Sequence, residues 1–231
     1  MIRFFARPGL VMTILLLAGC GGVEQTPPSV HTAIALPSPV HEGEMSVEQA
    51  LLERRSVRTY SDEPLTLAEI SQLLWAAQGV THPSGFRTAP SAGGLYPLEI
   101  LLLAVAVTDL AHGIYRYEPD GRELLLIVEG DHRQELSHAA LDQTAILEAP
   151  AVIVIAAVYE RTKVKYGERG VQYVHIEAGC ASENIYLQAV SLDLGTVFIG
   201  AFHDEEVREV LQLEADEQPL GIMPVGREQV P

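Results

Sequence analysis

Apolar residues recur at helical spacing in several parts of the chain. The segment "SVEQALLERRS" begins at Ser46, three residues before Gln49, which is the spacing of a capping box at a helix N-terminus. A second box, Thr66 to Glu69, precedes "LAEISQLLWAAQG". A short helix is predicted over "DEEVREVLQL". The longest apolar stripe predicts a helix that ends at Gly195; it comprises Val171, Val174, Ala178, Ala181, Ile185, Ala189 and Leu192.

Apolar runs of strand length alternate with these helices. "LEILLLAVAV" (98–107) and "APAVIVIAAVY" (149–159) are predicted to be buried strands, and "TVFIGAF" and "LGIMPVG" two further strands. "GIYRYEPDGRELLLIVEG" alternates around a Pro-Asp-Gly turn and predicts a hairpin. A hairpin among intermixed helices favours an α+β fold, with a central, mostly antiparallel sheet flanked by helices, over a doubly wound parallel sheet.

The N-terminus has the pattern of a bacterial export signal. Arg3 and Arg7 precede the apolar run 10–17, which is too short to span a bilayer. Leu-Ala-Gly before Cys20 resembles the lipobox of lipoproteins, so we expect residues 1–19 to be a signal peptide and Cys20 to be lipidated. The alternative is an ordinary secretory signal with an incidental cysteine.

That reading of the N-terminus sets the expected domains and location. Residues 20–44 are rich in Gly, Pro, Ser and Thr and are expected to form a flexible tether. Residues 45–231 would then be the folded domain, held by lipid at the outer side of a membrane in the cell envelope. No partner in the membrane beyond this anchor is predicted.

Composition excludes several classes of ligand. The chain has 31 acidic and 15 basic residues, and removing Arg3 and Arg7 with the signal leaves 13 basic residues, a net charge of −18. Such a charge argues against a nucleic-acid partner. The chain has neither G-x-G-x-x-G nor G-x-x-x-x-G-K-[ST], and no spacing predicts a metal site. Cys180 would be the one thiol left; it is either a redox thiol or a small buried side chain.

Two clusters of basic residues interrupt this acidic composition. "ERRSVRTY" contains Arg54, Arg55, Ser56 and Arg58, whose guanidinium and hydroxyl donors suit a phosphate. The alternative is that the arginines complement the dipole of the preceding helix. "RTKVKYGERG" contains Lys163, Lys165, Tyr166 and Arg169, in which a Lys-Tyr pair can act as acid or base. The alternative for that segment is a solvated loop.

Between these clusters lies "RTAPSAGGLYP", a loop of small residues. The backbone amides around Gly93 and Gly94 could approach a flat or phosphorylated ligand without obstruction by side chains. Taken alone, the loop is an ordinary turn, and the roles of Arg87 and Tyr96 within it stay open.

Together these segments resemble the FMN-dependent nitroreductase superfamily, and within it the SagB/ThcOx-type dehydrogenase branch. The resemblance covers about residues 47 to 228 and rests on five stretches in the right order: "RRSVRTYSDEPLTLAEISQLLWAAQG", "GFRTAPSAGGLYPLEI", "KYGERGVQYVHIEAGCASENIYLQA", "LGTVFIGAF" and "PVG". It implies a homodimer of the nitroreductase-like α+β fold with one FMN in each of two clefts between the subunits.

The resemblance also implies roles for particular residues. Lys165 and Tyr166 match a pair that removes a proton from the substrate during dehydrogenation, and are the expected catalytic residues. The expected flavin contacts fall into five groups: Arg54, Arg55, Ser56 and Arg58 at the phosphate and the ring edge; Pro90, Ser91, Ala92 and Gly93 at the ring, from the other subunit; Asn184 on the long helix; Gly200 and Ala201 at the flavin N5; and Gly226 and Arg227 over the phosphate.

The resemblance is incomplete on the long helix. Cys180 stands where a histidine is usual, and Glu183 precedes Asn184 where a glutamine is usual. The implied function is an FMN-dependent oxidoreductase that moves two electrons and oxidises a small or peptide-borne substrate, with oxygen or a quinone as acceptor. The alternatives are an NAD(P)H-dependent nitro or quinone reductase and a flavin-binding lipoprotein without catalysis.

Overall fold

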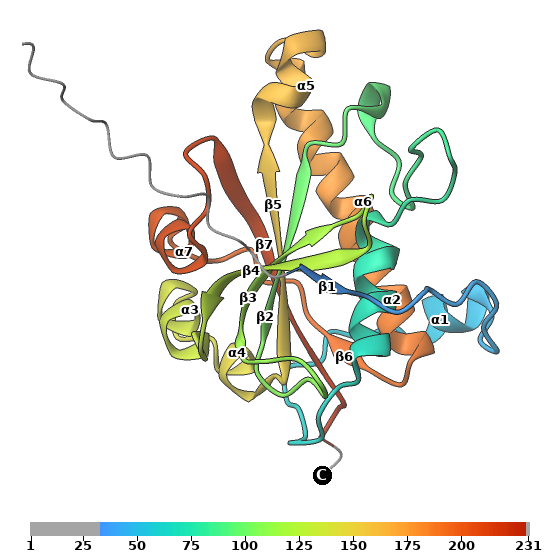
Figure 1. Cartoon of the computed structure of the whole chain (residues 1–231), viewed down its shortest axis with the longest axis vertical. Coiled ribbons are helices and arrows are strands. Elements are labelled where there is room, and N and C mark those ends of the chain that lie inside the picture. Colours follow the sequence, from blue (N-terminus) through green and yellow to red (C-terminus); the bar gives the residue numbers. More distant parts are fainter. Residues whose placement is uncertain (1–32, 230–231) are drawn as a thin grey trace, which may run out of the picture. The chain divides into compact units, whose positions relative to one another are not determined.

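A central antiparallel sheet organises the computed structural model, which describes residues 33–229 (Figure 1). Within that range seven strands follow the order β1-β4-β3-β2-β5-β7-β6, and every pair is antiparallel. The predicted α+β class with a mostly antiparallel sheet is therefore confirmed. The strands are β1 (Ala33–Ala35), β2 (Leu98–Ala104), β3 (Gly113–Glu118), β4 (Glu123–Glu129), β5 (Ala151–Val158), β6 (Gly195–Thr196) and β7 (Glu217–Gly226).

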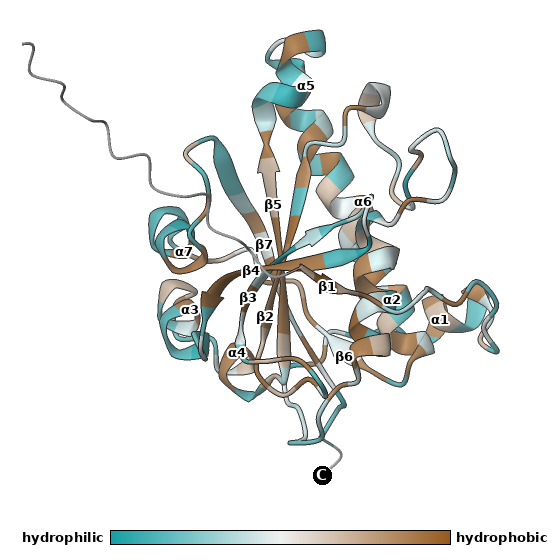
Figure 2. Ribbon diagram, in the orientation of Figure 1, coloured by the Kyte–Doolittle hydropathy of each residue, from teal (hydrophilic) through white to brown (hydrophobic). Residues whose placement is uncertain are grey.

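Helices cover both faces of the sheet. One face packs against α2 (Leu67–Gln78) and the long α6 (Arg169–Ser191), with α1 (Val47–Glu53) beside α6. The other face packs against α3 (Arg133–Ala139), α4 (Thr144–Glu148) and α7 (Asp204–Leu211). Figure 2 shows the apolar strands gathered at the centre between these layers.

Strand β5 shows how the sequence specifies this arrangement. All eight of its residues are buried. Its odd-numbered side chains join one core, and those of Val152, Val154 and Ala156 join the other. A strand covered on both faces is a continuous apolar run and lacks the alternation of a half-exposed strand. The two cores together remove enough apolar surface from water to hold the edges of the sheet in place.

The predicted helix starts are confirmed in detail. The Ser46 side chain accepts a hydrogen bond from the Gln49 amide at 3.1 Å, and α1 begins at the next residue. At α2 the box is reciprocal, because Thr66 N–H also donates to the Glu69 carboxylate at 2.7 Å. Both N-cap side chains satisfy a backbone donor that the first turn of a helix leaves free. The box predicted at Ser46 is only half formed, however, because the Gln49 side chain donates to Glu53 instead.

The structured part of the chain starts earlier than the expected boundary at residue 45. The domain begins before residue 45, because β1 pairs with β4 and Pro37 accepts a hydrogen bond from the Ser71 side chain. The flexible tether therefore cannot include residues 33–37. The proposed signal peptide (1–19) and Cys20 lie outside the described residues.

The predicted strand "TVFIGAF" is also mostly irregular. Only Gly195 and Thr196 form a strand; Ile199 makes one isolated bridge to Ile222. The reason is a side-chain acceptor, since the Phe198 amide donates to the Tyr186 hydroxyl at 2.7 Å. Among residues 33–229, no helix combines the length and apolar character needed to cross a membrane.

Candidate functional site

The small-residue loop and the Lys-Tyr pair meet in the structure. "RTKVKY" forms α5 (Tyr159–Tyr166), so the alternative of a solvated loop there is wrong. The loop contains a short 3₁₀ turn, η1 (Ala92–Gly94), in which Gly93 has a φ of 68°. A Cβ placed on Gly93 would lie 2.8 Å from both Lys165 Nζ and Tyr166 Oη. The ammonium and the phenol thus converge on a glycine where almost any side chain would displace them.

The same loop is fixed from within by its own side chains. Ser91 Oγ accepts a hydrogen bond from the Tyr96 amide at 2.9 Å, and Tyr96 adopts a left-handed φ of 45°. The Arg87 guanidinium stacks on the Tyr96 ring at 4.6 Å, and its Nη1 donates to Gln78 Oε1 at 3.1 Å. Arg87 and Tyr96, whose roles the sequence left open, therefore hold the loop in shape.

Beneath the loop lies a buried carboxyl group that sequence reasoning missed. Glu177 on α6 is only 2% exposed and contacts the Ser91 and Gln78 side chains. Burial raises the pKa of its carboxyl to about 7, although Ser91, Arg87 and Gln78 all favour the charged form. Glu177 Oε1 and Gln78 Nε2 have no hydrogen-bond partner among the described residues. Glu177 thus supports Ser91 from below and can gain or lose a proton near neutral pH.

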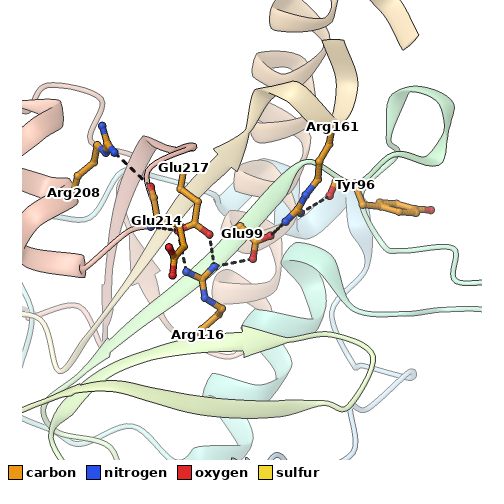
Figure 3. A network of polar contacts seen from close by, with 7 residues as sticks. All are labelled: Tyr96, Glu99, Arg116, Arg161, Arg208, Glu214 and Glu217. Atoms are coloured by element: carbon orange, nitrogen blue, oxygen red, sulfur yellow. Dashed lines mark hydrogen bonds and ion pairs between the residues drawn. The ribbon is translucent and has the colours of Figure 1, made fainter. Parts of the chain in front are cut away.

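A polar network anchors α5, and with it the Lys-Tyr pair, to the sheet (Figure 3). Arg161 on α5 pairs with Glu99 of β2 at 2.5 Å and donates to the Tyr96 carbonyl at 3.2 Å. Glu99 in turn pairs with Arg116 on β3, whose guanidinium forms a two-bond fork with Glu217 on β7. The Arg116 guanidinium and the Glu214 amide lower the pKa of the Glu217 carboxyl. Arg161 and Arg116, joined through Glu99, therefore connect the helix, the loop and three strands.

The Arg/Ser cluster lies at the other end of α6. The Arg54 guanidinium stacks on the Tyr186 ring at 5.1 Å, and Ser56 Oγ lies 3.2 Å from the Tyr186 hydroxyl. Arg55 donates to the Leu52 and Arg54 carbonyls at the end of α1, so the helix-dipole alternative describes Arg55 well. None of Arg54, Arg55 and Arg58 forms an ion pair with a carboxylate in the described range.

Tyr186 links this cluster to the segment that follows β6. Its hydroxyl contacts Ser56 and accepts the Phe198 amide, so Gly200 and Ala201, both exposed, follow directly from a fixed point. The backbone of Val57 donates to Thr196, which brings the Arg/Ser segment alongside β6. Sequence reasoning did not single out Tyr186.

The remaining predicted contacts are engaged within the chain. Asn184 Nδ2 donates to the Ala76 carbonyl and so ties α6 to α2. Gly226 is buried, and a Cβ on it would lie 2.8 Å from Pro150. Arg227 pairs with Glu63 and Glu69, and only its Nη1 is without a partner among the described residues. Arg227 lies beside the Arg/Ser segment through the bond from the Ser61 amide to its carbonyl.

Within a single chain, the two groups of predicted flavin contacts lie at different points along α6. Ser91 contacts α6 at Glu177, and Ser56 contacts α6 at Tyr186, nine residues further along the helix. At a rise of 1.5 Å per residue, these points are about 14 Å apart. The structure therefore brings Pro90–Gly93 to Lys165 and Tyr166, and Ser56 to the segment before Gly200, as two separate groups.

Redox-active side chains are few in this region. Cys180 is a free, partly exposed thiol that packs against the core beneath α6. Within the described range, no cluster of three or more His, Cys, Asp or Glu residues is arranged to hold a metal ion.

Comparison with known proteins identifies the family. The model of the Nitroreductase family matches residues 51–227. A protein of Methanocaldococcus jannaschii, provisionally named a nitroreductase, is 50% identical over 80% of this chain and 92% of its own length. The FMN reductase [NAD(P)H] of Bacillus subtilis is 25% identical over 78% of this chain, and the match covers 65% of that protein.

Solved structures agree with this assignment. A structure provisionally named a nitroreductase, from Ralstonia eutropha, has a TM-score of 0.75 at 31% identity and covers 86% of this chain and 90% of its own. One from Anabaena variabilis has a TM-score of 0.76 at 31% identity over 86% of this chain, which spans only 42% of that longer one. A chain in the Escherichia coli microcin synthetase complex shares the fold alone (TM-score 0.69, 21% identity, 96% and 85% coverage). The chain therefore belongs to the nitroreductase family of oxidoreductases.

Proposed function

We propose that this protein is an FMN-dependent dehydrogenase of the SagB type, which removes two electrons and two protons from a small or peptide-borne substrate. The observation that carries the proposal is the convergence of Lys165 Nζ and Tyr166 Oη on Gly93. A base must lie within hydrogen-bond reach of the carbon or heteroatom that loses its proton, and these two atoms face one point from the same helix.

The side chains fit a flavin mononucleotide. Arg54 and Arg58 have no carboxylate partner among the described residues, so their positive charge is available to a phosphate. Gly94 has positive φ, is exposed and has open space where a Cβ would lie, which leaves an unobstructed stretch of backbone for a flat ring. When bound, FMN supplies a ring that accepts two electrons and becomes anionic on reduction.

Different residues of the chain would bind the phosphate, orient the ring and accept the substrate proton. Arg54, Ser56 and Arg58 would bind the phosphate and balance negative charge, with Asn184, Gly200 and Ala201 as further contacts. The loop at Pro90–Gly93 would form the wall that orients the ring. Lys165 and Tyr166 would take the substrate proton.

We also propose that the active protein is a homodimer. The two halves of the flavin site are separated along α6, so a second chain that supplies the Pro90–Gly93 loop would complete each site. α1 exposes three large apolar side chains, Val47, Leu51 and Leu52, next to a cavity of about 640 Å³ that Asn184 helps to line. Burial of such a patch drives association. Sedimentation equilibrium should give twice the mass of the chain; a monomer that binds FMN would contradict this.

The location in the cell envelope is a further proposal, supported by the lipobox-like sequence around Cys20. Outside the inner membrane NAD(P)H is scarce, so a substrate dehydrogenation coupled to oxygen or a quinone suits that compartment. Mass spectrometry of the N-terminal peptide from membranes should find lipid on Cys20. An unmodified, soluble N-terminus would contradict the anchor.

The main alternative is an NAD(P)H-dependent nitro or quinone reductase, which the name of the Bacillus subtilis relative favours. The test is anaerobic mixing of the FMN-loaded protein with NADH or NADPH, followed at the visible flavin band. Slow or no bleaching by either nucleotide supports the dehydrogenase. Rapid bleaching that persists in Lys165→Ala supports the reductase, and a protein that never retains FMN supports a role without flavin catalysis.

A further inference from the structure

The basic residues of the described chain fall into two groups. Six of the thirteen within residues 33–229 are paired with carboxylates: Arg116, Arg133, Arg161, Lys163, Arg208 and Arg227. Lys165 and Arg169 have no ion pair within residues 33–229, although acidic residues outnumber basic ones about twofold. The two neighbouring glutamates, Glu160 and Glu168, both point to Lys163. The positive charge at the α5–α6 corner is therefore not neutralised.

These two cations contact aromatic rings instead. Lys165 Nζ lies 5.4 Å from the centre of the Tyr166 ring, and the Arg169 guanidinium lies 5.6 Å from that of Tyr173. The two rings meet edge to face at 5.1 Å and 90°. Lys165, Tyr166, Arg169 and Tyr173 thus form one cation–aromatic cluster. An aromatic face orients a cation but leaves its charge in place.

The cluster borders the point where the substrate must react. Its Lys165 and Tyr166 atoms face Gly93, and Arg169 and Tyr173 continue from them onto the first turn of α6. Arg169 is exposed, so its guanidinium fork is open to a ligand. A substrate whose reacting atom lies at Lys165 and Tyr166 would meet Arg169 and Tyr173 with its adjoining part.

We propose that Arg169 and Tyr173 select a substrate that carries a carboxylate next to a planar group. The guanidinium fork matches the two oxygens of a carboxylate, and the tyrosine ring packs against a planar amide or aromatic group. The net charge of −16 repels anions over most of the surface. An anionic substrate would therefore bind where a cation such as Arg169 is not neutralised by a carboxylate. This inference rests on the proposed function, because it assigns the substrate class of the same site.

The test uses two probes of nearly equal shape and different charge, 4-nitrobenzoate and 4-nitrobenzamide. Binding of each to the FMN-loaded protein is measured by a saturation-transfer NMR titration. The variant is Arg169→Gln, with Arg169→Lys as the conservative rescue. Arg122→Gln is the matched control, because Arg122 is also exposed and also without an ion pair in the described range, but lies at the β3–β4 turn.

We expect wild type to bind the benzoate roughly tenfold more tightly than the benzamide, which corresponds to about 1.4 kcal/mol. Arg169→Gln should lose this preference, Arg169→Lys should keep part of it, and Arg122→Gln should keep all of it. An equal preference in wild type and Arg169→Gln, or an equal loss in Arg122→Gln, would overturn the inference. Failure of the proposed function looks different, because the protein would then retain no yellow flavin, or NAD(P)H would bleach the flavin rapidly in Lys165→Ala as well.

Discussion

The buried carboxyl of Glu177 should make the protein less stable as the pH rises. Its pKa is raised from 4.5 to about 7 by burial. At 1.36 kcal/mol for each unit, the charged form costs about 3 kcal/mol in the folded state. The folded protein binds more protons than the unfolded chain between these two pKa values, so the free energy of unfolding falls as pH rises from about 4.5 to about 7.

Replacing Glu177 with glutamine should remove this loss, because an amide of the same shape carries no charge. The assay is urea unfolding of wild type and Glu177→Gln at pH 5, 6, 7 and 8. We expect the stability difference in favour of the variant to grow by about 2–3 kcal/mol between pH 5 and pH 8. Glu183→Gln, on the same helix but half-exposed, is the control for a general change in charge.

Two results would refute this reasoning. A stability difference that is the same at every pH would mean that Glu177 is ionised in the folded protein throughout the range. A variant that is less stable at pH 8 would mean that the Ser91 and Gln78 contacts need the carboxylate itself. Either outcome would also remove the proton-holding role of the group beneath Ser91.

Three further predictions concern the site. Lys165→Ala should lose turnover but keep its flavin, whereas Lys163→Ala, two residues away and paired with Glu160, should keep both; equal loss in the two variants would point to damage of α5. Gly93→Ala should lower turnover at least tenfold, because its Cβ would displace the Lys165 and Tyr166 atoms and its φ of 68° costs about 1 kcal/mol; wild-type kinetics would contradict that contact. Arg161→Met should raise hydrogen exchange in α5 and reduce turnover, and unchanged exchange would show that Arg161 does not anchor the helix.

The elements that sequence patterns predicted well are those whose own residues specify them. Helix α2 has its capping box, Thr66 and Glu69, within four residues, and β5 is an uninterrupted apolar run. Strand "TVFIGAF" failed because its Phe198 amide bonds to Tyr186 on a different element. A pattern within the segment carries no information about a hydrogen-bond acceptor on a neighbouring helix.

The same reasoning explains what was missed in the site. Glu177 lies three residues after Val174 and four before Ala181, both in the predicted apolar stripe of α6. An acidic residue at such a position signals a buried carboxyl, so this signal was present in the sequence. The sequence identified the loop with Ser91 and the Lys165–Tyr166 pair as two separate candidate segments. Their contact at Gly93 depends on how α5 packs, and only the three-dimensional structure shows it.

The visible spectrum of the purified protein tests the central claim most directly. After incubation with FMN and removal of the free flavin by gel filtration, the protein should be yellow and should release about one FMN per chain on denaturation. Ser56→Ala with Arg58→Gln should bind the flavin much more weakly. A protein that emerges colourless, with no FMN in the denatured fraction, would contradict the account of this site as a flavin site.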